Sequence, residues 1–163
     1  MKKVPVLIII TIIAFATVCM AEYGYVKGPP ELSATMSGEN IMPPVKTNAA
    51  GKATLTLNQD RTLFFYKVTV SEIEDVTAAH IHIGKKGEAG PPIALIAISA
   101  KKKGKISGIL AEGSIGAGDL MTSFKGKDIQ ALYQQLTDGD NYINIHTLKY
   151  PDGEIRGQIK IMN

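Results

Sequence analysis

The sequence predicts an all-β protein, an antiparallel β-sandwich with one short helix. The first observation is that roughly eight short segments of the 163-residue chain alternate apolar and polar residues, as half-buried strands do. The second is that glycine, proline, asparagine and aspartate residues, which favour turns, separate these segments. The third is that apolar residues recur with a helical period in a single segment after the N-terminal region.

The first 21 residues have the pattern of a secretory signal peptide. Lys2 and Lys3 precede an almost uninterrupted apolar run from Val4 to Val18, and the small residues Cys19 and Ala21 suit cleavage after residue 21. The run is shorter than the roughly 20 apolar residues of a membrane-spanning helix. We therefore expect a secreted or extracytoplasmic protein. An uncleaved membrane anchor and a lipoprotein acylated at Cys19 are the alternatives.

Cleavage would change the charge and the cysteine content of the chain. The full sequence has a net charge of +3 and one cysteine. Without Lys2, Lys3 and Cys19, 16 basic residues remain against 15 acidic ones, a net charge of about +1. We expect no nucleic-acid partner at so weak a charge. A mature chain without cysteine has no disulfides, so packing of the core must stabilise it.

Residues 22–30 contain glycine and proline without periodicity, which predicts a flexible linker, and residues 31–163 then form the domain. Alternation at 32–37 predicts its first strand. The segments 52–57 and 62–70 predict a hairpin. In the second of these, the expected buried face is the one with more apolar residues: Phe64, Tyr66, Val68 and Val70.

The middle of the domain carries two charged or polar connections between predicted strands. We expect residues 72–76 to form a loop that leads to a strand carrying two histidines. Residues 84–92 then turn the chain back into a strand over 93–98. The lysine-rich run 101–105 predicts a solvated turn before a strand over 106–115.

The end of the domain contains the predicted helix and two more strands. Ile129, Leu132, Tyr133 and Leu136 lie on one helical face, which we expect to cap an open end of the sandwich. Residues 141–147 and 154–162 predict strands joined by a turn. The expected inward residues of the last strand are Ile155, Gly157, Ile159 and Ile161.

The three histidines of the chain all fall on predicted strands, at positions that point away from the core. In an extended chain, residues two apart share a face, so His80 and His82 lie together, opposite Ile81. His146 likewise lies opposite Ile145. We expect all three imidazoles at the surface of the sheet.

Several motifs in this order resemble the chordin-type domain, CHRD. The resemblance extends from about Leu32 to Ile161. Its motifs are Met-Pro-Pro-Val (42–45), Ala-His-Ile-His-Ile-Gly (79–84), Gly-Pro-Pro (90–92), Tyr-Ile-Asn-Ile-His-Thr (142–147) and Pro-Asp-Gly-Glu-Ile-Arg-Gly-Gln-Ile (151–159). The resemblance implies an all-β fold, and we expect an immunoglobulin-like or superoxide-dismutase-like sandwich.

A polar patch is expected around the histidines. If the last two strands pair, their outward residues face one another: Tyr142, Asn144 and His146 on one strand and Glu154, Arg156 and Gln158 on the other. One allowed register sets His146 against Glu154 and Asn144 against Arg156. Three imidazoles suit zinc or copper, and a His-x-His strand with a later histidine is similar to part of the copper site in copper-zinc superoxide dismutases. The alternative is a structural network in which Arg156 clamps Glu154 or nearby backbone.

The sequence supports three functional hypotheses. The first is a secreted, non-enzymatic binding or structural module for an extracellular protein or surface ligand. The second is an extracytoplasmic zinc or copper protein using His80, His82 and His146, with storage, transfer or weak redox activity. The third is adhesion to an anionic surface through Lys101, Lys102, Lys103 and Lys105. We assign no catalytic residues, because the chain lacks nucleophile-elbow, phosphate-loop and dinucleotide motifs.

Overall fold

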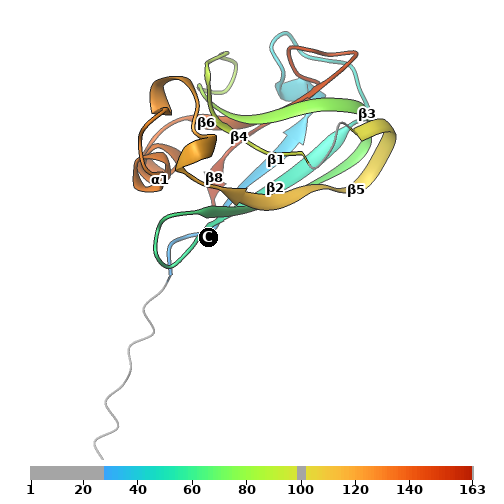
Figure 1. Ribbon diagram of the computed structural model, residues 1–163. Helices are drawn as coiled ribbons and strands as arrows, with labels where there is room; N and C mark the ends of the chain where they lie inside the picture. Colours follow the sequence, from blue (N-terminus) through green and yellow to red (C-terminus); the bar gives the residue numbers. More distant parts are fainter. Residues whose placement is uncertain (1–27, 99–101, 163) are drawn as a thin grey trace, which may run out of the picture.

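The computed structural model describes residues 28–98 and 102–162, which form a β-rich domain with one short α-helix (Figure 1). The predicted signal peptide and residues 22–27 of the predicted linker lie outside these residues. The elements, in chain order, are β1 (Leu32–Ser37), η1 (Gly38–Asn40), β2 (Ala50–Leu57), β3 (Phe64–Ile83), β4 (Pro92–Leu95), β5 (Lys102–Ile115), η2 (Ala117–Asp119), η3 (Thr122–Phe124), α1 (Ile129–Asp138), β6 (Asn141–Thr147), β7 (Ile155–Gln158) and β8 (Lys160–Ile161).

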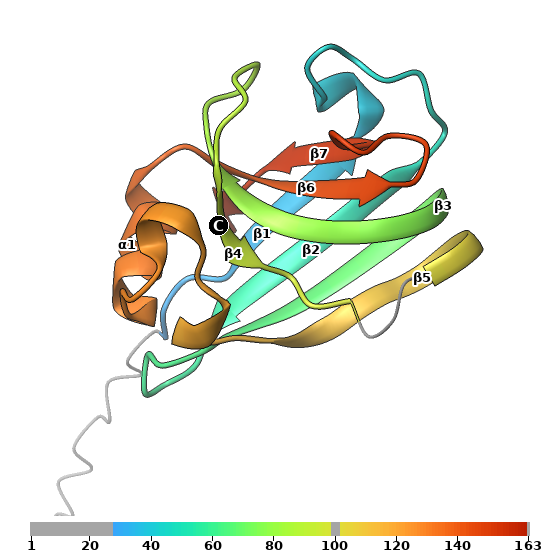
Figure 2. The ribbon, with the colours of Figure 1, turned by 45° about the horizontal axis from the view of Figure 1, so that its top comes forward.

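The main sheet closes into a five-stranded antiparallel barrel, so the sandwich prediction is wrong. The strands follow the order β2-β1-β7-β6-β3, and β3 pairs with β2 to complete the circle (Figure 2). The closure depends on the 20-residue strand β3, whose first part pairs with β2 and whose second part pairs with β6. One bent strand therefore joins what would otherwise be two separate sheets.

The bend in β3 lies at the segment that the sequence predicts as a loop. Glu72 and Asp75 have positive φ angles of 56° and 50°, and the pairing with β5 shifts register here. Left-handed residues of this kind bend a strand and increase its twist without ending it. The predicted loop over 72–76 is therefore wrong, because these residues continue the strand as irregular positions.

Strands β4 and β5 pair with β3 outside the closed circle. The predicted strand over 93–98 appears as β4, which ends at Leu95. The predicted lysine turn is wrong for its described part, because β5 begins at Lys102, and Lys101 lies outside the described residues. The backbone N–H of Gly104 donates to Asp75 Oδ1 (2.7 Å), which attaches this end of β5 to the bend of β3.

Alternation of apolar residues builds the core as the sequence predicts. The β2–β3 hairpin is confirmed, and Phe64, Tyr66, Val68 and Val70 are all buried. The first strand and the inward isoleucines of β6 also lie in the core. One inward position is wrong: Ile161 is 44% exposed, because β8 is only two residues long and lies near the end of the chain.

The predicted helix is confirmed as α1, which lies at one end of the barrel in both ribbon views (Figure 1, Figure 2). Asp128 caps it by accepting the Ala131 backbone N–H (2.8 Å). Its buried apolar residues are Ile129, Leu132 and Leu136. The Tyr133 ring stacks on Phe64 at the start of β3, with centroids 6.4 Å apart. In the described part of the chain, no helix has the length and apolarity that crossing a membrane requires.

Candidate metal centre

The three histidines converge on the outer face of the barrel, where β3 pairs with β6. Cα partners in this pairing are His80 with Asn144 and Ala78 with His146. Ile81, which lies between His80 and His82, is fully buried in the core. The predicted outward orientation of the imidazoles is therefore correct, and the assumed adjacency of the two strands is confirmed.

The prediction that all three imidazoles are exposed is wrong for one of them. His82 is only 8% exposed, whereas His80 and His146 are partly exposed. The loop between β3 and β4 covers His82, and its Gly90 carbonyl oxygen lies 2.9 Å from His82 Nδ1. Alternation fixes the face of a strand, but a covering loop decides how much water reaches that face.

The geometry of the three rings suits a metal ion. Each histidine offers one ring nitrogen, and these three atoms all lie within 4.8 Å of one another. His80 Nδ1 and His146 Nε2 are 3.4 Å apart. Zinc–imidazole bonds are about 2.0–2.1 Å long, so nitrogens bound to one ion lie roughly 3–3.5 Å apart. Small side-chain movements would bring these three nitrogens to that spacing.

Backbone carbonyl groups fix the tautomers of two of the rings. Because a carbonyl oxygen only accepts, His82 Nδ1 donates to Gly90 O (2.9 Å) and His146 Nδ1 donates to Pro151 O (2.8 Å). The lone pair of each ring therefore lies on Nε2. His82 Nε2 is buried and has no hydrogen-bond partner among the described residues. Such carbonyl contacts are the usual outer support of metal-binding histidines.

The surroundings favour the neutral, metal-binding form of the imidazoles. Burial, together with the neighbouring His146 and His82, lowers the pKa of His80 to about 4. Burial also lowers the pKa of His82; the hydrogen bond to Gly90 opposes this shift, while His146 and Arg156 reinforce it. Neutral imidazole is the form that binds metals, so protons compete weakly at these two rings near neutral pH.

Arg156 clamps the loop over His82. Its Nη1 donates to Glu88 O and its Nη2 to Lys85 O, both at 2.7 Å, and Nη2 also donates to Gln158 Oε1 (3.0 Å). Arg156 is 3% exposed, and its Cα is the partner of Asn144 in the β6–β7 ladder, as one predicted register requires. Of the two predicted roles, Arg156 holds nearby backbone, and no hydrogen bond or ion pair in the described part of the chain joins it to Glu154.

Tyr142 and Gln158, which the sequence places on the outward polar face, belong to the same assembly. Arg156 Cζ lies 3.4 Å from the Tyr142 ring centroid, and the Tyr142 ring stacks on His82 at 4.9 Å. Gln158 Nε2 donates to Gly84 O (3.0 Å). Strand parity predicts that both side chains lie on the outer face, and they pair in register there. No sequence pattern indicates which carbonyl groups of the loop accept hydrogen bonds.

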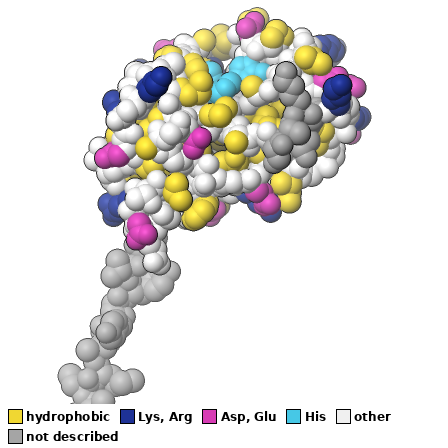
Figure 3. Space-filling view, viewed as in Figure 1, with side chains coloured by type: hydrophobic (Ala, Val, Ile, Leu, Met, Phe, Trp, Pro, Cys, Tyr) yellow, Lys and Arg dark blue, Asp and Glu magenta, His cyan; other side chains and the backbone are white. Residues whose placement is uncertain are grey.

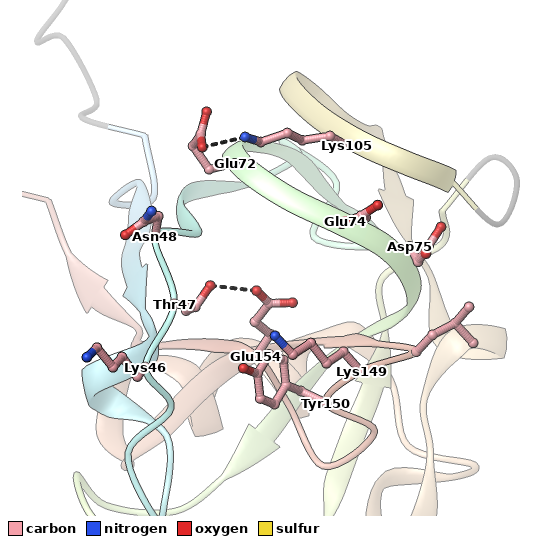
Figure 4. A pocket seen from close by; sticks show the side chains of 11 residues that line it. Lys46, Thr47, Asn48, Glu72, Glu74, Asp75, Lys105, Lys149, Tyr150 and Glu154 are labelled. Atoms are coloured by element: carbon pink, nitrogen blue, oxygen red, sulfur yellow. Dashed lines mark hydrogen bonds and ion pairs between the residues drawn. The ribbon is translucent and has the colours of Figure 1, made fainter.

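The side chain of Glu154, which the sequence places beside His146, contacts two threonines instead, although its backbone N–H donates to Ile145 O (2.8 Å). It is buried and accepts hydrogen bonds from Thr47 Oγ1 (2.7 Å) and Thr147 Oγ1 (2.9 Å). It lines a separate cavity of about 870 Å³, drawn in Figure 4, and no histidine lines that cavity. The prediction is wrong because Glu154 precedes β7 and is not in its paired ladder, so strand parity does not apply to it.

We expect Glu154→Ala to destabilise the domain by about 2–3 kcal/mol, because two threonine hydroxyls lose their acceptor in a buried place. Glu154→Gln, which keeps one acceptor oxygen, should cost less. The measurement is urea unfolding followed by circular dichroism, with the exposed Glu39→Ala as control. A Glu154→Ala variant as stable as the control would contradict this role.

The metal-free protein should lose stability as the pH falls from about 6.5 to 4. The unfolded His80 binds a proton near pH 6.5, whereas the folded ring does so only near pH 4, so protons favour the unfolded chain in this window. Because the ring is partly exposed, we expect a loss on the order of 1–2 kcal/mol. Urea unfolding of chelator-treated protein across this range would measure it, and His80→Asn should flatten the dependence. Equal slopes in both proteins would exclude His80 as the cause.

The lysine run gives no converging site in the described residues. Lys103 is exposed, and Lys105 forms an ion pair with Glu72 (2.7 Å) at the bend of β3. Adhesion to an anionic surface through these lysines stays a prediction.

Fold and site together define a closed antiparallel β-barrel domain that carries three clustered imidazoles on its outer face. The chain belongs to the CHRD domain family, whose model matches residues 32–159. It is 31% identical to chordin of Xenopus laevis over 140 residues, and 29% identical to chordin of Danio rerio over 145 residues. Each match covers 82% of this chain and 13% of the chordin chain. No solved structure matches the chain.

Proposed function

We propose that this CHRD domain is a secreted binding module whose ligand is a transition-metal ion, zinc or copper, held by His80, His82 and His146. The single observation that carries the proposal is the convergence of three ring nitrogens within 4.8 Å. Two of them have lone pairs fixed by backbone carbonyls, which supports a site prepared for a metal.

The structural alternative is weaker for a physical reason. If the rings served only to hold the strands together, the buried His82 Nε2 would be expected to have a hydrogen-bond partner. It has none among the described residues, and its pKa is lowered, so protonation does not satisfy it. A metal ion would take this lone pair and remove the cost of leaving it unpaired.

Zinc and copper fit the donor set better than harder cations do. Three neutral imidazoles bind both ions well, and magnesium and calcium prefer oxygen ligands. The signal-like N-terminal segment supports an extracytoplasmic location, where a metal-storage or metal-transfer role would be exercised. No catalytic step is part of this proposal.

The test is metal titration of the untagged, chelator-treated protein, because its three histidines are the only ones in the chain. Calorimetry with Zn²⁺ and Cu²⁺ should show one ion per chain. The Cu²⁺ form should give an electron paramagnetic resonance spectrum with nitrogen coupling. Bound Zn²⁺ should also raise the melting temperature, since it binds the folded state.

The His80→Ala/His82→Ala/His146→Ala variant should lose this binding, while Lys52→Ala/Thr56→Ala, exposed on β2, should keep it. Equal uptake of both metals by the wild type and the triple variant would refute the proposal. If uptake depends on the histidines, metal analysis of protein purified from its native compartment would identify which ion is bound.

A further inference from the structure

We infer that the metal centre keeps one coordination position for a small exogenous ligand, a water molecule or a monodentate anion, and that the Asn144 amide donates a hydrogen bond to it. This inference rests on the proposed metal function. It goes further by naming the class of ligand that the centre would bind and the residue that would orient it.

The described part of the chain supplies three imidazole donors to this cluster. Among the described residues, the cluster that could hold a metal ion contains three histidines and no carboxylate or thiolate. Zinc prefers four ligands, and three protein ligands leave one position for an external group. Because the three imidazoles are neutral, the double charge of the ion is also uncompensated, which favours an anion.

The cluster is open to solvent on one side. His82 is buried beneath its loop, whereas His80 and His146 are partly exposed. Histidine side chains are visible at the molecular surface in Figure 3. An ion held among the three rings would therefore have the buried His82 on its inner side. A ligand from solvent would reach the ion on the side of His80 and His146.

The Asn144 side chain presents an N–H group at this place. It is 5% exposed, and its Nδ2 donates to the backbone oxygen of Asp152 (3.0 Å) while lying 3.4 Å from His146 Nε2. Swapping the amide nitrogen and oxygen would bring two oxygens together at Asp152, so that contact fixes the orientation. One N–H of Nδ2 bonds to Asp152, and the other is available toward the centre.

Metal binding would deprive this second N–H of Asn144 of its present partner, His146 Nε2. The lone pair of His146 Nε2 would then be directed at the ion and could no longer accept from Asn144. A buried N–H without an acceptor is costly, so an oxygen or nitrogen of an external ligand is the natural replacement. Asn144 would thereby favour ligands that can both bind the ion and accept a hydrogen bond.

The experiment uses the full chain loaded with one equivalent of Cu²⁺ and titrated with sodium azide. We expect a saturable azide-to-copper absorption band. At full copper occupancy, Asn144→Ala should weaken azide binding about tenfold, the effect of one lost hydrogen bond. Asn48→Ala, an exposed asparagine in the separate cavity, is the matched control and should behave as the wild type.

Two measurements on the wild type need no variant. The copper-loaded protein should enhance water-proton relaxation, and azide should reduce this enhancement by displacing water. In the zinc-loaded protein, the Asn144 side-chain amide resonance should shift when azide is added.

Bound copper that shows neither an azide band nor enhanced water relaxation would refute the open coordination position. Equal azide affinity in Asn144→Ala and no amide shift would overturn the role of Asn144. Failure to bind copper at all would instead refute the proposed function.

Discussion

Replacing Arg156 by methionine should destabilise the domain by about 2–3 kcal/mol and weaken metal binding by 10- to 100-fold. The guanidinium makes three hydrogen bonds from a nearly inaccessible position, two of them to carbonyls of the loop that covers His82. Methionine fills similar space but donates nothing. Without the clamp, Gly90 O would no longer be held against His82 Nδ1, and loss of such an outer contact reduces metal affinity by this amount.

Urea unfolding and zinc calorimetry measure the two effects separately. Arg156→Lys should be intermediate, because a single ammonium group lacks the planar fork that reaches two carbonyls at once. Lys160→Met removes an exposed basic residue of β8 and should change stability by less than about 0.5 kcal/mol. If Arg156→Met bound zinc as tightly as the Lys160 variant, the loop would not support the centre.

Replacing Gly157 by alanine should lower stability by about 2–3 kcal/mol, a fall in Tm of roughly 6–10 °C. Gly157 lies in β7, where that strand approaches β1 to close the barrel. A Cβ atom here would overlap the carbonyl oxygen of Thr35 and lie 3.0 Å from Met36 Cγ. The backbone of Thr35 cannot move aside as a flexible side chain can, so β1 and β7 would have to move apart.

Thermal unfolding followed by circular dichroism would measure this effect. Gly118→Ala is the matched control, because a Cβ at Gly118 meets no atom within 4 Å. We expect that variant to melt within about 2 °C of the wild type. Equal melting temperatures for the two variants would show that close approach at Gly157 does not limit barrel closure.

Features of this protein that depend on a few neighbouring residues are predictable from the sequence, whereas features that depend on distant contacts are not. Period-two alternation correctly identifies the buried face of β3 and the outward orientation of the histidines, because parity is a property of a single extended strand. The same reasoning fails at Glu154, which lies just outside the paired ladder of β7. Sequence reasoning also fails at Glu72 and Asp75. The charged and polar residues there predict a loop, but two residues with positive φ bend the strand without ending it.

The sequence by itself determined the family, the predominance of strands, the helix α1 and the choice of three histidines as candidate ligands. These depend on patterns within a few residues or on motifs in a fixed order. The tertiary structure alone decided that the sheet closes as a barrel, that a loop covers His82, and that Arg156 holds this loop by its carbonyl groups. Every peptide unit has the same carbonyl, so only the path of the folded chain selects which ones meet a donor.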